Sequence, residues 1–159
     1  MKPDWLLLLA REWIDDVTLC FAISSGENGD TNARIVQPRK PTDDWIVDFL
    51  TNRRCRKVRE IEKSAKMTLA YQHERDRGYV CLLGRASIID DVELKRSRWT
   101  PDADRWNPVG PDDPAVVYAR LETQRIELWS AVRNVMPEPR GYSAAVLVRD
   151  GGGWRYSAT

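Results

Sequence analysis

The sequence has one histidine, His73, among its 159 residues, and this scarcity excludes several kinds of site. Metal centres that need two histidine ligands are excluded by count. A Ser-His-Asp or Cys-His enzyme would have to use His73, yet no Gly-x-Ser-x-Gly nucleophile elbow accompanies it. We therefore expect His73 to be a surface or edge-strand residue, and we assign no catalytic residue and no metal site.

Cysteines and long apolar runs are also few. The three cysteines, Cys20, Cys55 and Cys81, are odd in number and widely spaced, which favours reduced, mostly buried thiols over disulfides or a zinc site. The longest apolar run, residues 5–10, is too short to span a membrane. No signal peptide is visible, because the first residues lead directly into a charged helix. We expect a cytoplasmic protein without a membrane partner.

Glycine-rich phosphate loops are missing as well. Neither Gly-x-x-x-x-Gly-Lys nor Gly-x-Gly-x-x-Gly occurs, so a P-loop or Rossmann site has no support. The net charge is +1, without the broad positive excess of nucleic-acid-binding domains, and we expect no nucleic-acid partner. A length of 159 residues with 42% hydrophobic content predicts one globular domain over residues 1–159.

Hydrophobic periodicity predicts a mainly β protein with peripheral helices. Helices are expected over residues 4–17, 54–66 and 92–99, with Asp4 capping the first. Strands are expected over residues 18–25, 33–37, 45–50, 67–73, 79–90, 116–121 and 125–129, followed by a hairpin over 143–156. Asn28-Gly29 suits a primed hairpin turn, and Gly84 indicates a bulge or a close backbone approach. Because hairpin-like links dominate, we expect an antiparallel sheet closing into a barrel or sandwich.

The most distinctive stretch is the junction between the strand ending near Thr51 and the following helix. Five cations fall within seven positions there: Arg53, Arg54, Arg56, Lys57 and Arg59. Cations at a helix N-terminus oppose the helix dipole, as expected where an anion is meant to bind. Composition alone favours a solvated basic helix start, and phosphate capture by Thr51, Arg56 and Lys57 is the alternative.

For several other residues the sequence allows both a structural role and a functional role. Cys55 lies on the apolar stripe of the helix and is predicted to be structural, although a helix N-terminus would lower its pKa. The pairs Asp90-Asp91 and Asp112-Asp113 suit turns or helix caps better than acid–base catalysis. Most of the seven tryptophans should be core residues, but three lie in polar stretches and are candidates to face a flat aromatic ligand: Trp99, Trp106 and Trp129.

Several short motifs together resemble the FMN-binding split-barrel proteins related to pyridoxamine 5′-phosphate oxidase, and most closely their general stress protein branch. The resemblance covers about residues 5–130 and, more loosely, the last hairpin. No single motif decides it, but their order is specific: Ala33-Arg-Ile-Val36, Phe49-Leu-Thr51, Arg56-Lys-Val58, Val80-x-x-x-Gly84-x-Ala86, Asp90-Asp91, Trp99, Gly110-Pro-Asp-Asp113 and Glu127-Leu-Trp129.

The resemblance implies a six-stranded antiparallel split barrel that forms a homodimer, with FMN bound at the subunit interface. Arg56 and Lys57 match the pair that grips the FMN phosphate, with Leu50 and Thr51 at the preceding strand end. The strand beside the isoalloxazine and ribityl chain matches Arg34, Ile35 and Val36. Tyr79 stands where the oxidases place a flavin-contacting Gln, and Trp129 matches a Trp supplied by the partner subunit.

Departures from the family pattern define the alternatives. After Trp129 the chain has no Arg-x-His-type motif, which holds the substrate phosphate in the oxidases, so pyridoxine phosphate oxidation is not expected. Cys55 replaces the Ser or Thr found before the Arg-Lys pair in many members. We expect a flavin-dependent oxidoreductase or a flavin carrier in stress response. The alternatives are an interaction module without cofactor, or a relative that uses FAD, F420 or haem.

Overall fold

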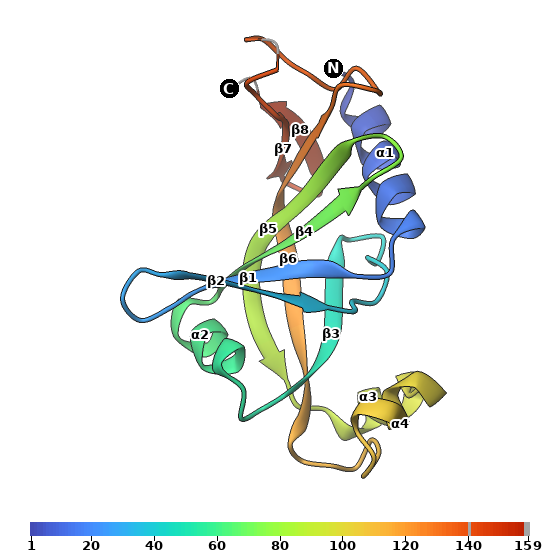
Figure 1. The fold of residues 1–159 in the computed structure, drawn as a ribbon, viewed down its shortest axis with the longest axis vertical. Coiled ribbons are helices and arrows are strands. Elements are labelled where there is room, and N and C mark those ends of the chain that lie inside the picture. The colour runs from blue at the N-terminus through green and yellow to red at the C-terminus, as the bar shows by residue number, and fades with distance from the viewer. Residues whose placement is uncertain (140, 158–159) are drawn as a thin grey trace.

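The computed structural model describes residues 1–139 and 141–157, and within them the chain forms eight strands and four helices (Figure 1). In chain order these are α1 (Pro3–Asp16), β1 (Cys20–Ser25), β2 (Thr31–Val36), β3 (Ile46–Asn52), α2 (Arg56–Ser64), β4 (Lys66–His73), β5 (Gly78–Ile89), α3 (Val92–Arg98), α4 (Pro101–Trp106), β6 (Val116–Ser130), β7 (Ala145–Asp150) and β8 (Gly153–Ser157). The predicted class, mainly β with peripheral helices, is confirmed. The sheet has eight described strands and not six, because the C-terminal hairpin extends it.

Every pairing in the sheet is antiparallel, as predicted, and the strand order is β2-β1-β4-β5-β6-β7-β8, with β3 also paired to β6. The first half of β6 pairs with β3, and its second half pairs with β7. In Figure 1, β5 and β6 run along the length of the molecule, whereas β1 and β2 cross it and project as a hairpin.

The core lies between the inner face of the sheet and α1. This helix presents Leu6, Leu9 and Trp13 at helical spacing, and all three are buried against apolar residues of the strands. Asp4 is not the helix cap, because the helix begins at Pro3, and Asp4 therefore lies in the first turn. No helix among the described residues is long and apolar enough to cross a membrane.

A bulge interrupts the pairing of β5 with β6. Leu83 pairs with Arg125 and Gly84 pairs with Thr123, so Gln124 is one residue in excess on β6. A Cβ atom at Gly84 would lie 2.0 Å from the carbonyl oxygen of Glu122, which is why glycine is needed there. The bulge predicted at Gly84 is confirmed. The prediction of two separate strands, at residues 116–121 and 125–129, is wrong, because β6 continues through the bulge.

The turn between β1 and β2 also differs from the prediction. Gly26 N–H donates to the carbonyl of Asp30 and Gly29 N–H to that of Gly26, while Gly29 alone in this loop has a positive φ, 78°. A primed turn with Asn28 and Gly29 at its centre would need positive φ at both residues. The predicted primed turn is therefore wrong, and the loop is the longer type that ends in a left-handed glycine.

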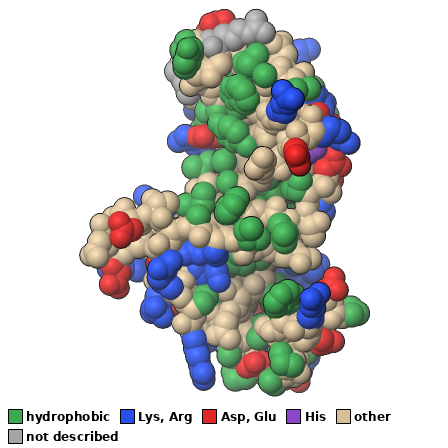
Figure 2. All heavy atoms as spheres, in the orientation of Figure 1, with side chains coloured by type: hydrophobic (Ala, Val, Ile, Leu, Met, Phe, Trp, Pro, Cys, Tyr) green, Lys and Arg blue, Asp and Glu red, His purple; other side chains and the backbone are tan. Residues whose placement is uncertain are grey.

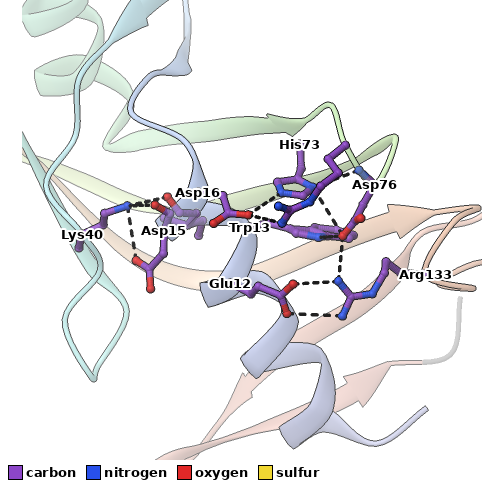
Figure 3. A network of polar contacts seen from close by, with 10 residues as sticks. Glu12, Trp13, Asp15, Asp16, Lys40, His73, Asp76 and Arg133 are labelled. Carbon is purple, nitrogen blue, oxygen red and sulfur yellow. Dashed lines mark hydrogen bonds and ion pairs between the residues drawn. The ribbon is translucent and has the colours of Figure 1, made fainter.

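His73 is buried, so the prediction of a surface or edge position is wrong. Its ring stacks on Trp13 with centroids 5.6 Å apart, and its Nε2 lies 3.1 Å from Asp16 Oδ2 (Figure 3). The Trp13 indole and Arg133 both donate to Asp76 Oδ2 at 2.8 Å, and Arg133 also pairs with Glu12. This network fastens α1 to the β4–β5 turn and to the segment after β6, and it explains His73 as a structural residue.

Candidate functional site

The basic stretch that begins α2 forms a patch on the surface. Figure 2 shows Lys and Arg side chains gathered beside α2, below the projecting β1–β2 hairpin. The helix begins at Arg56, with Cys55 in extended conformation as its N-cap residue and no side-chain capping hydrogen bond. No acidic residue occupies the first turn. The N-terminal end of a helix and the surrounding cations favour an anionic ligand.

Thr51, Cys55 and Lys57 form the first of two clusters at this junction. Lys57 Nζ donates to Thr51 Oγ1 at 3.0 Å and to Cys55 Sγ at 3.4 Å. The Thr51 hydroxyl and the Cys55 sulfur are 3.3 Å apart. The end of β3 and the start of α2 thus bring an ammonium, a hydroxyl and a thiol to one place, and two of these groups belong to predicted site residues, Thr51 and Lys57.

The Cys55 thiol lies in an electropositive setting. Burial alone would raise its pKa, but the hydrogen bond with Thr51, a backbone hydrogen bond at Val58 and the Lys57 charge lower it overall. The other two cysteines differ, because burial raises the pKa of Cys81 and takes that of Cys20 to about 12. A partly exposed thiol beside a lysine is the most readily ionised of the three.

Arg34 and Arg56 form the second cluster, and both pair with Glu60. The Glu60 carboxylate is 3.3 Å from Arg34 NH2 and 3.3 Å from Arg56 Nε, and it also accepts from Asn32 at 2.7 Å and from the Ser24 hydroxyl. Burial would raise the pKa of Glu60, but these hydrogen bonds from Ser24, Arg34 and Asn32 lower it overall. The cluster connects the β1–β2 hairpin with the first turns of α2.

The two aromatic residues that the family resemblance implies for the flavin site, Tyr79 and Trp129, lie elsewhere, in a groove of about 790 Å³ on the outer face of the sheet. Tyr79 and Trp129 are cross-strand neighbours there, on β5 and β6. A second groove, of about 420 Å³, continues along β1 and contains Ile35. Phe21 lines both grooves, so the two form one surface, which we call the outer groove.

The structure therefore divides the predicted site residues into two groups. Arg34 faces α2, whereas Ile35 lies on the opposite face of β2, as alternation along a strand requires. Val36 packs against the core, and Leu50 is half-buried beside Thr51. Within one chain the cations of α2 and the aromatic pair of the outer groove do not line a common pocket among those described.

Sequence reasoning missed Glu60, which gathers Arg34 and Arg56. A signal was present, because Glu60 follows Arg56 by four residues and such pairs face each other on a helix. The contact with Arg34 joins residues that are 26 positions apart in the sequence, and no local pattern predicts it. Sequence reasoning also assigned no role to Asp48, which is buried on β3 between Arg98 and Arg120, at 2.7 and 2.8 Å.

The remaining candidates have structural roles. Asp91 caps α3 by accepting from the N–H of Leu94, and Asp113 accepts from the N–H of Ala115, as expected for turns and caps. Trp99 donates to Asp104, and Trp106 is exposed at the end of α4. Of the three tryptophans in polar stretches, Trp129 lines the outer groove.

Comparison with known proteins agrees with this architecture. Over 84 residues the chain is 30% identical to general stress protein 26 of Bacillus subtilis (strain 168), a match that covers 51% of this chain and 59% of that protein. The matching part thus spans less than two thirds of the relative.

Two solved structures have the same fold. One is a Clostridium acetobutylicum protein related to general stress protein 26, with a TM-score of 0.74 and 21% identity over 82% of this chain and 92% of that one. The other is a pyridoxamine 5′-phosphate oxidase-related, FMN-binding protein from Nostoc punctiforme PCC 73102, with a TM-score of 0.74 and 16% identity over 100% and 97%.

The sequence model of one family covers most of the chain. The family described as pyridoxamine 5′-phosphate oxidase like matches residues 9–146, which include both clusters at α2 and the aromatic pair of the outer groove. The chain belongs to the pyridoxamine 5′-phosphate oxidase-like family.

Proposed function

We propose that this protein binds FMN and acts as a flavin-dependent oxidoreductase or a flavin carrier in stress response. The observation that carries the proposal is the first cluster, in which Lys57 donates to Thr51, together with Arg56 in the first turn of α2, in a chain of this family. The family and the FMN-binding neighbour support the class of ligand, and the cluster supports its position.

The donors at this junction fit the phosphate of FMN. Lys57 supplies a point charge and Thr51 a hydroxyl, 3.0 Å apart, and Arg56 follows in the first turn with a mostly exposed guanidinium. Phosphate binds well to such mixed donors at a helix N-terminus. Cys55 takes part as a weak donor, so its contribution is smaller than that of a hydroxyl.

We further propose a homodimer in which the outer groove is the subunit interface. The groove exposes Phe21, Ile35 and Tyr79, an apolar surface on which a second copy of the chain would bury several large side chains. Figure 2 shows hydrophobic side chains spread along the visible face of the sheet. In such a dimer Trp129 of one subunit would complete the flavin site of the other.

When bound, the flavin supplies hydride or electron transfer, and the chain's own residues hold and orient it. Lys57, Thr51 and Arg56 would fix the phosphate, with the half-buried Leu50 beside Thr51 at the end of β3. The absence of an Arg-x-His-type motif after Trp129 argues against pyridoxine phosphate oxidation. FAD presents a phosphate to the same donors and is the alternative flavin.

The test is a visible absorption spectrum of the purified protein, followed by titration with FMN. Lys57→Ala should weaken FMN binding by about tenfold or more, because it removes a charge-assisted hydrogen bond. Lys63→Ala is the matched control, since Lys63 is an exposed lysine in the last turn of the same helix. Colourless protein that takes up no FMN would refute the proposal.

A second candidate function is an interaction module without cofactor. It is favoured by one observation: Lys57 Nζ already has Thr51 and Cys55 as partners, so the first cluster is satisfied within the protein. Mass spectrometry of freshly purified protein separates the candidates. FMN, FAD, F420 or haem in the sample would identify the cofactor, and its loss in an Arg56→Ala, Lys57→Ala double variant would reject the module.

A further inference from the structure

Glu60 is a buried carboxylate that contacts two arginines and two polar side chains. Its side chain is 5% exposed and accepts from Ser24, Asn32 and Arg34 while pairing with Arg56. Burying a carboxylate is costly unless its oxygens are paired, and here both oxygens have partners. A hydrophobic residue would be the simpler way to fill a position between a helix and a sheet, so the carboxylate needs an explanation.

The two arginines that pair with Glu60, Arg34 and Arg56, differ in exposure and in their other contacts. Arg34 is 21% exposed and donates through NH1 to Ser24 Oγ at 2.6 Å and to the carbonyl of Asn32 at 3.1 Å, besides pairing with Glu60 through NH2. Arg34 is therefore held in place by the hairpin itself. Its guanidinium is occupied by protein oxygens and is poorly placed to reach a ligand.

Arg56 is 64% exposed and pairs with Glu60 through Nε alone. The edge formed by its two terminal nitrogens stays available, since within the described parts of the chain no acceptor is found on them. Two parallel N–H groups on one edge are the arrangement that binds a phosphate in a forked manner. The carboxylate thus restrains an otherwise mobile side chain and leaves its binding edge open.

We propose that Glu60 is a positioning residue, clamped by Arg34, that aims the Arg56 guanidinium at a ligand phosphate. The inference rests on the proposed function and deepens it: Arg56 contacts the phosphate, whereas Arg34 acts through Glu60. The clamp also couples the site to the β1–β2 hairpin, because Ser24 and Asn32 hold the same carboxylate.

The experiment compares FMN with riboflavin, which lacks the phosphate, in four proteins: wild type, Glu60→Gln, Glu60→Asp and Glu62→Gln. Dissociation constants come from flavin fluorescence, and protection by inorganic phosphate comes from thermal melting. Glu60→Gln keeps the shape but removes the charge, and Glu60→Asp keeps the charge but shortens the reach. Glu62→Gln removes the same charge from an exposed position on α2.

We expect both Glu60 variants to bind FMN about tenfold more weakly while riboflavin affinity changes less than about twofold, with Glu62→Gln unchanged. A merely structural role would weaken both ligands in parallel with a fall in Tm. If the wild type binds FMN and the variants keep its preference for FMN over riboflavin, the positioning role is overturned and the proposed function stands.

Inorganic phosphate distinguishes the remaining cases. If the wild type binds phosphate but neither flavin, and the Glu60 variants lose the protection by phosphate, the proposed function fails and the positioning role holds. If phosphate protection is kept in those variants, the positioning role fails too. A wild type that binds none of the three compounds overturns both.

Discussion

Tyr79 on β5 and Trp129 on β6 lie directly opposite each other, with both side chains on the outer groove. Phe21 and Ile35 form a second cross-strand pair on β1 and β2, along the same surface. Such pairs stabilise a sheet by side-chain contact, but these four remain partly exposed to water. The outer face of this sheet therefore exposes an apolar surface, which the proposed dimer would cover.

The first prediction concerns this surface. Trp129→Arg should shift the protein from dimer to monomer, because a charge placed in an apolar interface is left without a partner when the interface closes. FMN affinity should fall together with dimerisation if Trp129 completes the partner's site. Size-exclusion chromatography with light scattering measures the assembly, and flavin fluorescence measures the affinity.

Trp106→Arg is the control for that variant, since Trp106 is 75% exposed on α4 and lines neither groove. It should leave mass and affinity unchanged. A Trp129→Arg protein that remains a dimer would show that the outer groove is not the interface.

The second prediction concerns the three thiols. Cys55 should react with iodoacetamide first, since its pKa is lowered, whereas burial takes the pKa of Cys20 to about 12. Each unit of pKa changes the thiolate fraction about tenfold, so the difference should be large near pH 7.5. Peptide mapping by mass spectrometry gives the rate at each cysteine.

Lys57→Ala tests the cause of that reactivity. Without the ammonium, the rate profile of Cys55 should move to higher pH, because the thiolate has lost a stabilising charge. Bound FMN should slow the reaction. Equal rates at all three cysteines would contradict the electrostatic account.

The third prediction concerns acid stability. Burial would raise the pKa of Asp48, but hydrogen bonds from Arg120 and Arg98 lower it overall. A carboxylate whose pKa is lower in the folded state than in the unfolded state stabilises the folded protein at any pH above its unfolded-state pKa, which is about 3.9 for Asp. This stabilisation is lost as pH falls from there through the folded-state pKa. Asp48→Asn should cost about 1–3 kcal/mol at pH 7, and the variant should lose less stability than the wild type as pH falls below about 4.

Urea unfolding across that pH range measures the effect of Asp48→Asn. Asp30→Asn is the control, because Asp30 is exposed at the tip of the β1–β2 hairpin. If both variants lose stability in acid as steeply as the wild type, Asp48 contributes nothing to the acid transition.

The fourth prediction concerns the bulge. Gly84→Ala should destabilise the fold by at least about 2 kcal/mol, because the added methyl group would overlap the Glu122 carbonyl. Gly152→Ala is the matched control, as a Cβ atom there meets nothing within 4 Å. Thermal and urea unfolding give the comparison, and equal stability of the two variants would show that the strands can separate at Gly84 without cost.

Local patterns predicted those elements whose own residues determine them. The apolar stripe of Leu6, Leu9 and Trp13 predicted α1, and Gly84 predicted the bulge, since each signal lies within one segment. The start of α2 was predicted for the same reason, two residues too early. The family resemblance, carried by ordered motifs, supplied the sheet architecture that periodicity alone left open between barrel and sandwich.

Positions that depend on distant partners could not be predicted. His73 reads as a polar strand end, and it is buried because Trp13 and Asp16 of α1 fold over it. Glu60 reads as one more charge on a basic helix, and its importance comes from Ser24 and Asn32, more than 25 residues away. Long-range polar contacts of this kind have no local signature.

The single residue by which β6 exceeds β5 has a geometric consequence. Before the bulge the inward-facing residues of β6 have odd numbers, as Leu121 and Thr123 do, and after it they have even numbers, as Ile126 and Leu128 do. The extra residue at the bulge, Gln124, causes this change, because successive side chains of a strand alternate between its two faces. With uninterrupted alternation, Trp129 would turn into the core. The length of one strand, counted to the residue, thus decides on which side of the sheet the aromatic ring is displayed.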